Sequence, residues 1–401
     1  MKKILFISGS LGLGHVKRDL AIAKELRKEN GNIEISWLAA HPASLVLRDE
    51  GETLLPEADI YANDNIFAEN AAKGFHLNLL KYLSNARGAW ATNVRVFEQV
   101  TSREKFDIII GDETYELAVA QIRNPHLNKA PFVMIYDFVG VNSMSRNPLD
   151  TLMAYIWNRI WAQDYKLLST GKSLALFVGE PEDIPDKRFG FLLPNRRHYS
   201  ETHYKFVGYI LGFDPAEYLD KKKIRAKLGY GEEALVICSV GGTSVGKRLL
   251  ELCGEAYTIL KAKVPGLHMI INFGPRISPE SLNLPEGVEA RQYIPELYQH
   301  FAASDLAIVL GGGTSTLELT AIRRPFLYFP LEGHFEQEIT VARRLTRHQA
   351  GEKMLFSQTT PRLLAEKVIS NIGKEVNYAT PKTDGARISA QIINKLLSMR
   401  R

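Results

Sequence analysis

Cysteine is almost absent from the 401 residues, since Cys238 and Cys253 are the only two. Two thiols support neither a disulfide framework nor a paired-cysteine zinc site, and they suit a reducing compartment. No run of residues approaches the roughly 18 uninterrupted apolar positions of a membrane span. The stretch Ile4–Ile7 is too short for the apolar core of a signal peptide, so we expect it to form a first strand. The sequence predicts a cytoplasmic protein with at most peripheral contact with a membrane.

A strong charge of either sign is also missing. Lys and Arg number 50 against 45 Asp and Glu, which gives a formal net charge of +5. This mild surplus specifies no anionic partner, and we expect no nucleic-acid binding. Apolar residues make up 45% and charged residues 24% of the chain, with 30 Gly and 18 Pro, which excludes wholesale disorder and collagen. At about 150 residues per domain, the length predicts two or three domains.

Short apolar, β-branched segments alternate with longer segments of helical period, the pattern of a parallel sheet flanked by helices. The pattern occurs twice. In the first half we expect strands at 3–8, 33–39, 106–111, 132–136, 174–178 and 206–210. In the second half we expect them at 235–240, 268–273, 288–292, 306–310 and 325–329. The sequence predicts an α/β protein with two doubly wound, Rossmann-like domains facing each other across a cleft, which would hold the ligand.

Two glycines and a proline between Gly208 and Pro215 mark a hinge between the two halves. We place the boundary after Gly212, which gives one domain of residues 1–212 and a second of residues 213–384. Apolar residues recur at helical spacing in residues 385–401, and we expect this last helix to pack back across the boundary.

The first predicted strand runs into a glycine-rich turn that ends in Gly14-His15. Glycines let backbone N–H groups approach a ligand at a helix N-terminus, where the helix dipole favours anions. The glycines run G-x-x-G-x-G and no carboxylate follows the second strand, which disfavours a nicotinamide dinucleotide site. The imidazole of His15 could act as a general base near neutral pH, or it could cap the turn.

The strand at 106–111 ends in two carboxylates, Asp112 and Glu113. Because parallel strands end at one edge of a sheet, these carboxylates are expected at the same edge as His15. Asp112, the better placed of the two, could accept a hydrogen bond from one ring nitrogen of His15 and leave the other nitrogen able to take a proton. Either carboxylate could instead cap the following helix.

The second half opens with a glycine turn after its first strand. The segment Gly241–Lys247 has the G-x-x-x-x-G-K spacing of a phosphate loop, but Arg248 stands where Ser or Thr would hold Mg²⁺. This departure disfavours an ATPase or kinase. We expect the turn to touch phosphate or nucleotide through Gly241, Gly242 and Thr243.

The most informative segment follows the strand at 306–310, where three glycines and three hydroxyl residues lead into a helix. Backbone and hydroxyl donors at the start of a helix could hold a diphosphate, and a carboxylate inside the helix could accept both hydroxyls of a ribose. The expected diphosphate donors are Gly312, Gly313, Thr314, Ser315 and Thr316, and the expected ribose acceptor is Glu318. In the polar loop downstream, His334, Glu336 and Gln337 have the hydrogen-bonding capacity that sugar hydroxyls require.

With these motifs the chain resembles the two-domain (GT-B) glycosyltransferases that use nucleotide sugars. It is most similar to the inverting group that contains the peptidoglycan GlcNAc transferase, the galactolipid synthases and the small-molecule UDP-glycosyltransferases. The resemblance covers the whole chain in architecture and roughly residues 235–345 in motifs. Gly14-His15 stands where that group has its G-H general base, and Asp112 stands where the small-molecule branch has the Asp that orients this His.

In the second half, Gly312, Ser315 and Glu318 match the family pattern G-x-x-S/T-x-x-E, which implies diphosphate contacts and a ribose-binding acid. The segment Pro330–Gln337 matches the one that contacts the sugar, and Tyr293-Ile294 lies where the family faces the uracil. The chain departs from the family at Leu310, where the small-molecule branch has a phosphate-contacting His. Leu11 and Leu13 alter the glycine pair of the peptidoglycan enzyme.

The resemblance implies an inverting transfer of a hexose or N-acetylhexosamine from a UDP-sugar to an acceptor hydroxyl, with His15 as the base. Backbone amides and a helix dipole would stabilise the leaving diphosphate, so no metal or other cofactor is expected. A UDP-sugar 2-epimerase and a non-catalytic sugar-nucleotide sensor on the same architecture are the alternatives.

Apolar residues between Leu149 and Trp161 fall at helical spacing, with Arg146 and Arg159 nearby. This helix could belong to the core, or it could meet a lipid surface or a lipid-linked acceptor such as a cell-envelope glycan. The basic clusters Lys221–Lys223 and Arg343-Arg344 are expected to be solvated helix faces.

Overall fold

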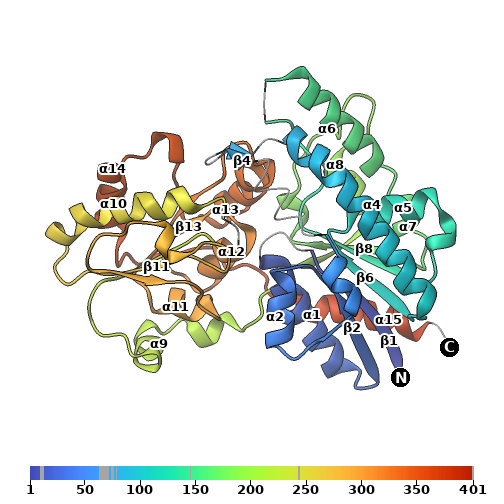
Figure 1. The fold of residues 1–401 in the computed structure, drawn as a ribbon, viewed down its shortest axis with the longest axis horizontal. Coiled ribbons are helices and arrows are strands. Elements are labelled where there is room, and N and C mark those ends of the chain that lie inside the picture. Colours follow the sequence, from blue (N-terminus) through green and yellow to red (C-terminus); the bar gives the residue numbers. More distant parts are fainter. Residues whose placement is uncertain are drawn as a thin grey trace. The chain divides into compact units, whose positions relative to one another are not determined.

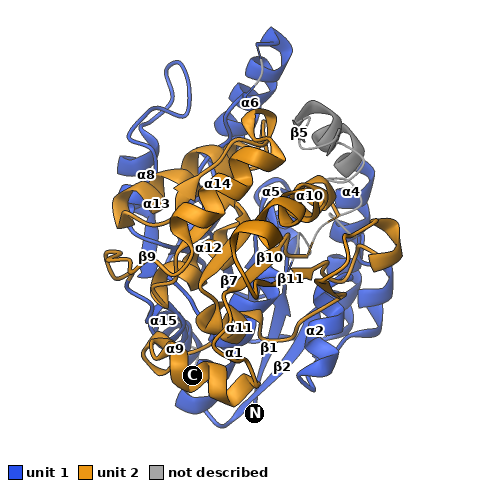
Figure 2. Ribbon diagram, turned by 90° about the vertical axis from the view of Figure 1, so that its left-hand side faces the viewer, with its two compact units in different colours: residues 1–71, 79–212, 382–401 blue, residues 72–78, 213–381 orange. Residues whose placement is uncertain are grey.

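A computed structural model describes residues 1–9, 13–62, 72–73, 76–77, 79–144, 146–242 and 244–399, and of residues 72–87 it describes only the backbone. The chain forms two compact units, coloured separately in Figure 2. Unit 1 comprises residues 1–71, 79–212 and 382–401, and unit 2 comprises residues 72–78 and 213–381. Each unit is built around one parallel sheet (Figure 1).

Unit 1 contains a seven-stranded sheet in the order β3-β2-β1-β6-β7-β8-β9. All of its strands run parallel. The order reverses beside β1, because β2 and β6 pair with its two sides, and this reversal is the switch point at which α/β sheets bind ligands. The strands are β1 (Lys2–Ile7), β2 (Ile33–Leu38), β3 (Thr53–Leu54), β6 (Ile108–Asp112), β7 (Phe132–Tyr136), β8 (Leu174–Val178) and β9 (Tyr204–Gly208).

Helices cover both faces of this sheet because successive strand residues point to opposite faces. Ile4 and Phe6 of β1 pack in one buried cluster with residues of α1, α2 and α15. Leu5 and Ile7 pack in another with residues of α4, α5 and α7. The helices of unit 1 are α1 (Gly14–Glu29), α2 (Ala43–Asp49), α4 (Leu79–Arg103), α5 (Tyr115–Arg123), α6 (Pro148–Trp161), α7 (Tyr165–Leu168), α8 (Arg196–His203) and α15 (Gly385–Ser398), with short η1 (Pro56–Ile60), η2 (Pro125–Leu127) and η3 (Pro181–Asp183).

Unit 2 contains a six-stranded parallel sheet in the order β12-β11-β10-β13-β14-β15, and β4 (Ala72–Lys73) and β5 (His76–Leu77) form a separate antiparallel pair. Val236 and Cys238 pack against α10 and α14 on one face. Leu235 and Ile237 pack against α9, α11, α12 and α13 on the other. The strands are β10 (Leu235–Ser239), β11 (His268–Asn272), β12 (Val288–Arg291), β13 (Leu306–Leu310), β14 (Phe326–Phe329) and β15 (Glu352–Lys353).

The helices of unit 2 complete the doubly wound arrangement. They are α9 (Lys221–Leu228), α10 (Lys247–Lys263), α11 (Leu297–Ala303), α12 (Gly313–Ala321), α13 (Ala342–His348) and α14 (Pro361–Asn371), with short η4 (Pro215–Tyr218), η5 (Pro279–Ser281), η6 (Glu336–Val341) and η7 (Phe356–Gln358). The predicted α/β class with two Rossmann-like sheets is confirmed. The cleft that we expected between the two sheets stays a prediction.

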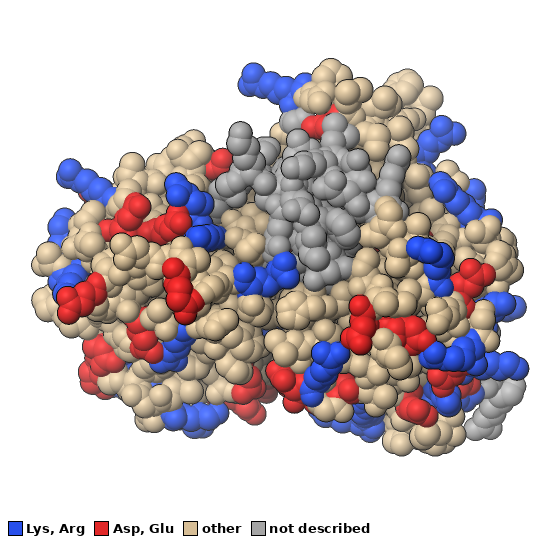
Figure 3. Space-filling view, viewed as in Figure 1, with Lys and Arg blue, Asp and Glu red and all other residues tan. Residues whose placement is uncertain are grey.

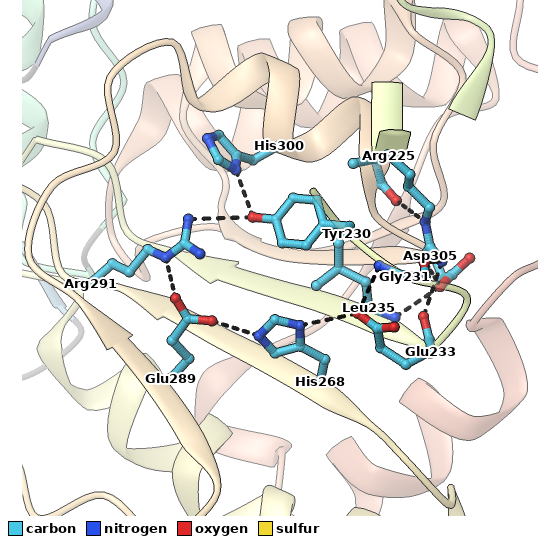
Figure 4. A network of polar contacts seen from close by, with 11 residues as sticks. Arg225, Tyr230, Gly231, Glu233, Leu235, His268, Glu289, Arg291, His300 and Asp305 are labelled. Carbon is cyan, nitrogen blue, oxygen red and sulfur yellow. Dashed lines mark hydrogen bonds and ion pairs between the residues drawn. The ribbon is translucent and has the colours of Figure 1, made fainter. Parts of the chain in front are cut away.

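A polar network joins residues at the amino-terminal ends of several unit 2 strands (Figure 4). Asp305, just before β13, pairs with Arg225 of α9 at 2.6 Å and accepts the backbone N–H of Leu235 at 2.8 Å. Next to it, His268 Nε2 lies 2.6 Å from Glu289 Oε2, and Glu289 also pairs with Arg291. Leu235 and His268 are the first residues of their strands, whereas Arg291 is the last residue of β12, so the network runs along this edge strand of the sheet.

None of the helices in the described part of the chain is long and apolar enough to cross a bilayer. On the face shown in Figure 3, acidic and basic side chains are interspersed, and no patch of one sign dominates. This mixture agrees with the small net charge of +5.

Candidate active site

The catalytic residues predicted in unit 1 come together at the carboxyl ends of β1 and β6. His15 is the second residue of α1, which follows β1, and Asp112 is the last residue of β6. Because β1 and β6 are parallel neighbours, the two side chains meet, with His15 Nδ1 3.0 Å from Asp112 Oδ2. The side chain of Asp112 is fully buried, and 13% of the His15 side chain is exposed. A buried carboxylate therefore holds a partly accessible imidazole.

Neither residue acts as a helix cap. The N-cap of α1 is Leu13, and that of α5 is Thr114, and no side chain caps either helix by a hydrogen bond. The capping alternatives for His15 and for the Asp112-Glu113 pair are therefore wrong. These side chains are held by one another and by charged neighbours.

Arg18, one turn after His15 on α1, binds both nearby carboxylates. Its Nε donates to Asp112 Oδ2 at 2.9 Å, and its Nη1 donates to Asp137 Oδ2 at 2.6 Å. Its Nη2 also donates to Asp112 Oδ1 and lies 2.9 Å from His15 Nδ1. When Nδ1 of His15 donates to Asp112, the other ring nitrogen, Nε2, is the one that can accept a proton.

The charges around His15 fix which groups are ionised. Burial opposes ionisation of Asp112 and Asp137, yet Arg18 holds the pKa of each carboxyl below its usual value. Burial also opposes protonation of His15, but Asp112 holds the pKa of its imidazole above the usual value. His15 is therefore a stronger base than a free histidine.

Two further acids in this cluster favour their neutral forms. Glu113 has a φ of 53°, in the left-handed region, and its Oε2 lies 3.7 Å from His15 Nε2. Burial, and then the charge of Asp137, raises the pKa of Glu113 well above its usual value. Asp19 is fully buried and accepts a hydrogen bond from Ser8 Oγ at 2.6 Å, and burial followed by Asp112 raises its pKa as well.

One group of side chains in the described residues has the spacing that a metal ion requires. His15, Glu113 and Asp137 each offer one ligand atom, and these atoms lie within 4.8 Å of one another. The guanidinium of Arg18 already binds Asp137 at 2.6 Å and would repel a dication there. The predicted absence of a metal stays a prediction.

In unit 2, the turn after β13 brings two of the predicted donor segments together. A Cβ on Gly311 would lie 2.8 Å from Pro330 Cα, so only glycine lets this turn approach the loop after β14. That loop contains His334 and leads into η6, whose first two residues are Glu336 and Gln337, and all three residues are half-buried. Gln337 Oε1 accepts the backbone N–H of Leu331 at 2.9 Å, so this oxygen supports the loop.

The start of α12 differs from the expectation at one hydroxyl. Gly312 is its N-cap, and Gly313, Thr314 and Ser315 are half-buried, so the first turn stays partly accessible. Thr316 is fully buried, and its hydroxyl donates to the carbonyl of Gly312 at 2.7 Å. The Thr316 hydroxyl therefore supports the helix and does not suit the predicted diphosphate contact, because a buried, intrahelical donor cannot reach a ligand.

A cation lies at this same turn. Arg344 of α13 donates through Nη2 to the carbonyl of Gly313 at 2.5 Å and to the Thr316 hydroxyl at 2.9 Å. Its neighbour Arg343 is exposed, as expected for a solvated helix face, but for Arg344 that expectation is wrong. No periodicity in the sequence indicates this contact, because it joins residues 28 and 31 positions apart.

Of the other predicted donor residues of unit 2, Gly241 and Gly242 follow β10, whereas Glu318 lies inside α12. Gly241 follows β10 and has a φ of 73°. It lies against Gly274, because a Cβ on Gly274 would be 2.1 Å from the carbonyl oxygen of Gly241. Gly242 is in the same turn, while Thr243 lies outside the described residues. Glu318 is only 4% exposed.

The residues expected to face the uracil follow β12, at the edge of the sheet. Tyr293 is half-buried, whereas Ile294 is 5% exposed and belongs to the core cluster around α11 and α12. The Ile294 side chain is therefore a core residue, because apolar burial against the neighbouring helices determines its direction, and only its backbone could contact a base.

Sequence reasoning missed Arg18, Asp137 and Arg344 as site residues. For Arg18 and Asp137, the sequence contained a pattern that could have placed them at the site. Arg18 follows His15 by three residues on a helix, which places both on one face, and Asp137 directly follows a predicted buried strand, as Asp112 does.

Comparisons with known proteins agree with this architecture. Residues 236–396 match the sequence model of the glycosyltransferase family 28 C-terminal domain. An uncharacterized glycosyltransferase of Methanopyrus kandleri is 26% identical over 199 residues, 48% of this chain and 54% of that protein. The UDP-N-acetylglucosamine--N-acetylmuramyl-(pentapeptide) pyrophosphoryl-undecaprenol N-acetylglucosamine transferase of Carboxydothermus hydrogenoformans is 27% identical over 33% of this chain and 36% of that protein. The chain thus matches about half the length of the first of these relatives, and less of the second.

Solved structures show the same fold over the whole chain. The glycosyltransferase of kitacinnamycin superposes with a TM-score of 0.60 at 14% identity, covering 99% of this chain and 95% of that one. MurG of Acinetobacter baumannii superposes with a TM-score of 0.52 at 15% identity, covering 100% of both chains. The chain therefore has the GT-B fold, and its resemblance to glycosyltransferases that use UDP-sugars is confirmed.

Proposed function

We propose that this protein is an inverting, metal-independent glycosyltransferase that transfers a hexose or N-acetylhexosamine from a UDP-sugar to an acceptor hydroxyl. The observation that carries the proposal is the His15–Asp112 pair, 3.0 Å apart at the carboxyl edge of a GT-B sheet. The match of residues 236–396 to the family 28 domain supports a nucleotide-sugar donor.

In the proposed reaction, Nε2 of His15 takes the proton of the acceptor hydroxyl. The acceptor oxygen attacks the anomeric carbon from the face opposite the diphosphate, and the bond from that carbon to the diphosphate breaks with its electron pair leaving on UDP. Asp112 stabilises the imidazolium that forms, which later gives its proton to water. The amides of the first turn of α12 and the guanidinium of Arg344 would offset the charge on the departing diphosphate.

The acceptor is proposed to be lipid-linked. The relative from Carboxydothermus hydrogenoformans is named for a pyrophosphoryl-undecaprenol acceptor. In this chain, α6 exposes Leu149, Leu152 and Ile156 at 62%, 53% and 42%, and the adjacent Phe191 is 80% exposed. Such a face, with Arg146 and Arg159 also exposed, suits peripheral contact with the inner face of a membrane.

The donor is tested first by thermal shift. UDP, UDP-GlcNAc and UDP-glucose with EDTA present are expected to raise the unfolding temperature, because a ligand that binds only the folded state stabilises it. ATP with Mg²⁺ and NAD are the comparison ligands. Stabilisation by ATP with Mg²⁺ alone would contradict the proposal and favour the Gly241–Lys247 turn as a phosphate loop.

The base is tested by His15→Ala. We expect sugar transfer to fall by about 10² or more, the scale of a general base, while UDP affinity changes little. Transfer is measured by UDP release with a lipid-linked acceptor, and affinity by calorimetry. Full activity in this variant would remove His15 from the mechanism.

A second candidate is a UDP-sugar 2-epimerase, which needs additional acids near the sugar. Glu113 and Asp137 lie beside His15 and are the candidates for these acids. Incubation of UDP-GlcNAc without acceptor distinguishes the two reactions, because only an epimerase would produce the epimeric UDP-sugar.

A further inference from the structure

Arg18 joins the two ionised carboxylates that face His15. It lies on α1 one helical turn after His15, and its side chain is 10% exposed. Asp112 belongs to β6 and Asp137 follows β7, so the guanidinium bridges the ends of two neighbouring strands. The planar fork of an arginine can make both contacts at once, whereas the single ammonium of a lysine cannot hold the same geometry.

The protonation of the His15 imidazole depends on the charged groups that face it, Arg18 among them. The groups that face it are Asp112 from β6, Glu113 after β6, Asp137 after β7 and Arg18 from its own helix. Asp19 interacts with Asp112 and Arg18 of the same cluster. Asp112 and Asp137 favour ionisation, while burial keeps Glu113 and Asp19 toward their neutral forms.

With Arg18 in place, one positive charge offsets two negative ones. A neutral imidazole can then exist beside a net charge of about −1, and proton uptake completes the neutralisation. Without Arg18, the imidazole would be the only cation facing two carboxylates and would keep its proton at neutral pH. A protonated His15 cannot act as a base.

We propose that Arg18 is a positioning residue that sets the pH above which His15 can accept a proton. The consequence for sugar transfer rests on the function proposed above. The effect of Arg18 on the protonation of His15 does not, because it follows from charge and geometry within unit 1.

The first test measures His15 itself in the full chain. Histidine-selective ¹⁵N labelling and NMR titration give its midpoint, with the His15→Gln variant used to assign the signal among the 10 histidines. Arg18→Met is expected to raise the midpoint by about 1–2 pH units, and Asp137→Asn to lower it, since the two substitutions remove charges of opposite sign. A purely structural role would not move the midpoint in opposite directions.

Arg27→Met is the matched control. Arg27 lies on the same helix and pairs with Glu52 at 2.6 Å. Its substitution removes one positive charge, as Arg18→Met does, but at a position that does not contact His15. We expect it to leave the His15 midpoint unchanged. Arg18→Lys keeps the charge and is expected to keep the midpoint within about 0.5 unit, while loosening the orientation of Asp112.

The second test is the pH profile of kcat/KM for transfer. Arg18→Met should raise the pH midpoint of the acidic limb by the same 1–2 units. Below this new midpoint kcat/KM falls roughly tenfold for each pH unit, and at higher pH it is restored. An unmoved His15 midpoint in folded Arg18→Met overturns the inference. If that variant fails to fold, an unmoved midpoint in Asp137→Asn overturns it. If the wild type transfers no sugar while the midpoints move as expected, the inference stands and the proposed function fails.

Discussion

Single side chains at the start of α12 determine how unit 2 could hold a diphosphate. Leu310 provides no cationic or hydrogen-bonding side chain at the end of β13, but Arg344 brings a guanidinium to the carbonyl of Gly313 from another helix. A cation at a helix N-terminus opposes the helix dipole, and an anionic ligand there would relieve that repulsion.

Arg344→Gln is therefore expected to weaken UDP binding by about tenfold or more, the scale of a hydrogen bond to a charged group. Uridine, which has no phosphate, should bind equally to both proteins. Calorimetry with the two ligands measures the difference, and Arg343→Gln, at the exposed neighbouring position, is the control. Equal losses for UDP and uridine would show that Arg344 acts on the fold rather than on the diphosphate.

The buried carboxyl group of Asp164 in unit 1 makes the free energy of unfolding depend on pH. Asp164 accepts hydrogen bonds from the hydroxyls of Tyr136, Tyr199 and Tyr204. Burial outweighs these bonds and raises the pKa of Asp164 to about 6. Between the usual carboxyl pKa of about 4 and this value, the folded state holds a proton that the unfolded state has released, so this contribution to stability falls as the pH rises.

Relative to Asp164→Asn, the wild type should therefore lose roughly 2–3 kcal/mol of unfolding free energy between pH 4 and pH 6.5. Urea unfolding at several pH values measures this, and the comparison with the variant cancels the other carboxylates. The four tryptophans, Trp37, Trp90, Trp157 and Trp161, all belong to unit 1, so their fluorescence reports on that unit. A constant difference across this range would contradict the raised pKa.

At the scale of elements, α6 is neither wholly core nor wholly exposed. Ala154, Asn158 and Trp161 are buried, and Trp157 contacts Trp90 of α4 edge-on with ring centroids 5.2 Å apart. The opposite face carries Leu149, Leu152 and Ile156 into solvent. The core interpretation therefore describes one face of this helix, and contact of the other face with a lipid surface or acceptor stays a prediction.

Replacing Leu152 and Ile156 together with Ser is expected to weaken binding to anionic lipid vesicles by at least about tenfold, because less apolar area enters the interface. Vesicle sedimentation measures the binding, and folding should be unaffected because both side chains are exposed. Ile60→Ser, at a position 58% exposed elsewhere in unit 1, is the control. Unchanged vesicle binding by the double variant would contradict a membrane role for this face.

At the scale of the whole molecule, the chain returns to unit 1 after completing unit 2. The last helix, α15, packs beside α1 and buries Ala390 and Ile393 in a cluster with residues of β1. Residues 382–401 therefore stabilise a unit whose other elements end at Gly212.

Ile393→Ala is expected to cost about 2–5 kcal/mol in the stability of unit 1, as for other large-to-small core substitutions. Tryptophan fluorescence during urea unfolding reports on this unit alone. Gln391→Ala, at an exposed position of the same helix, should change little. A loss seen only by circular dichroism, with the fluorescence transition unmoved, would place the effect in unit 2.

Local sequence patterns predicted much of the fold because buried parallel strands are short apolar runs. The strands at 132–136, 174–178 and 306–310 have the predicted bounds. The edge strands β3 and β15 were missed, since each has two residues and no apolar run. The His15–Asp112 contact was predicted because Asp112 ends β6 and His15 follows the turn after β1, the parallel neighbour of β6.

The sequence alone thus determined the α/β class, the two halves and the residue types at the strand ends, because these follow from periodicity and from the positions of glycine. Only the tertiary structure decided that Arg18 and Asp137 join the His15 pair, that Arg344 reaches α12, and that Thr316 and Ile294 turn inward. Such contacts depend on side-chain direction and on burial among segments distant in sequence, and no local pattern encodes them.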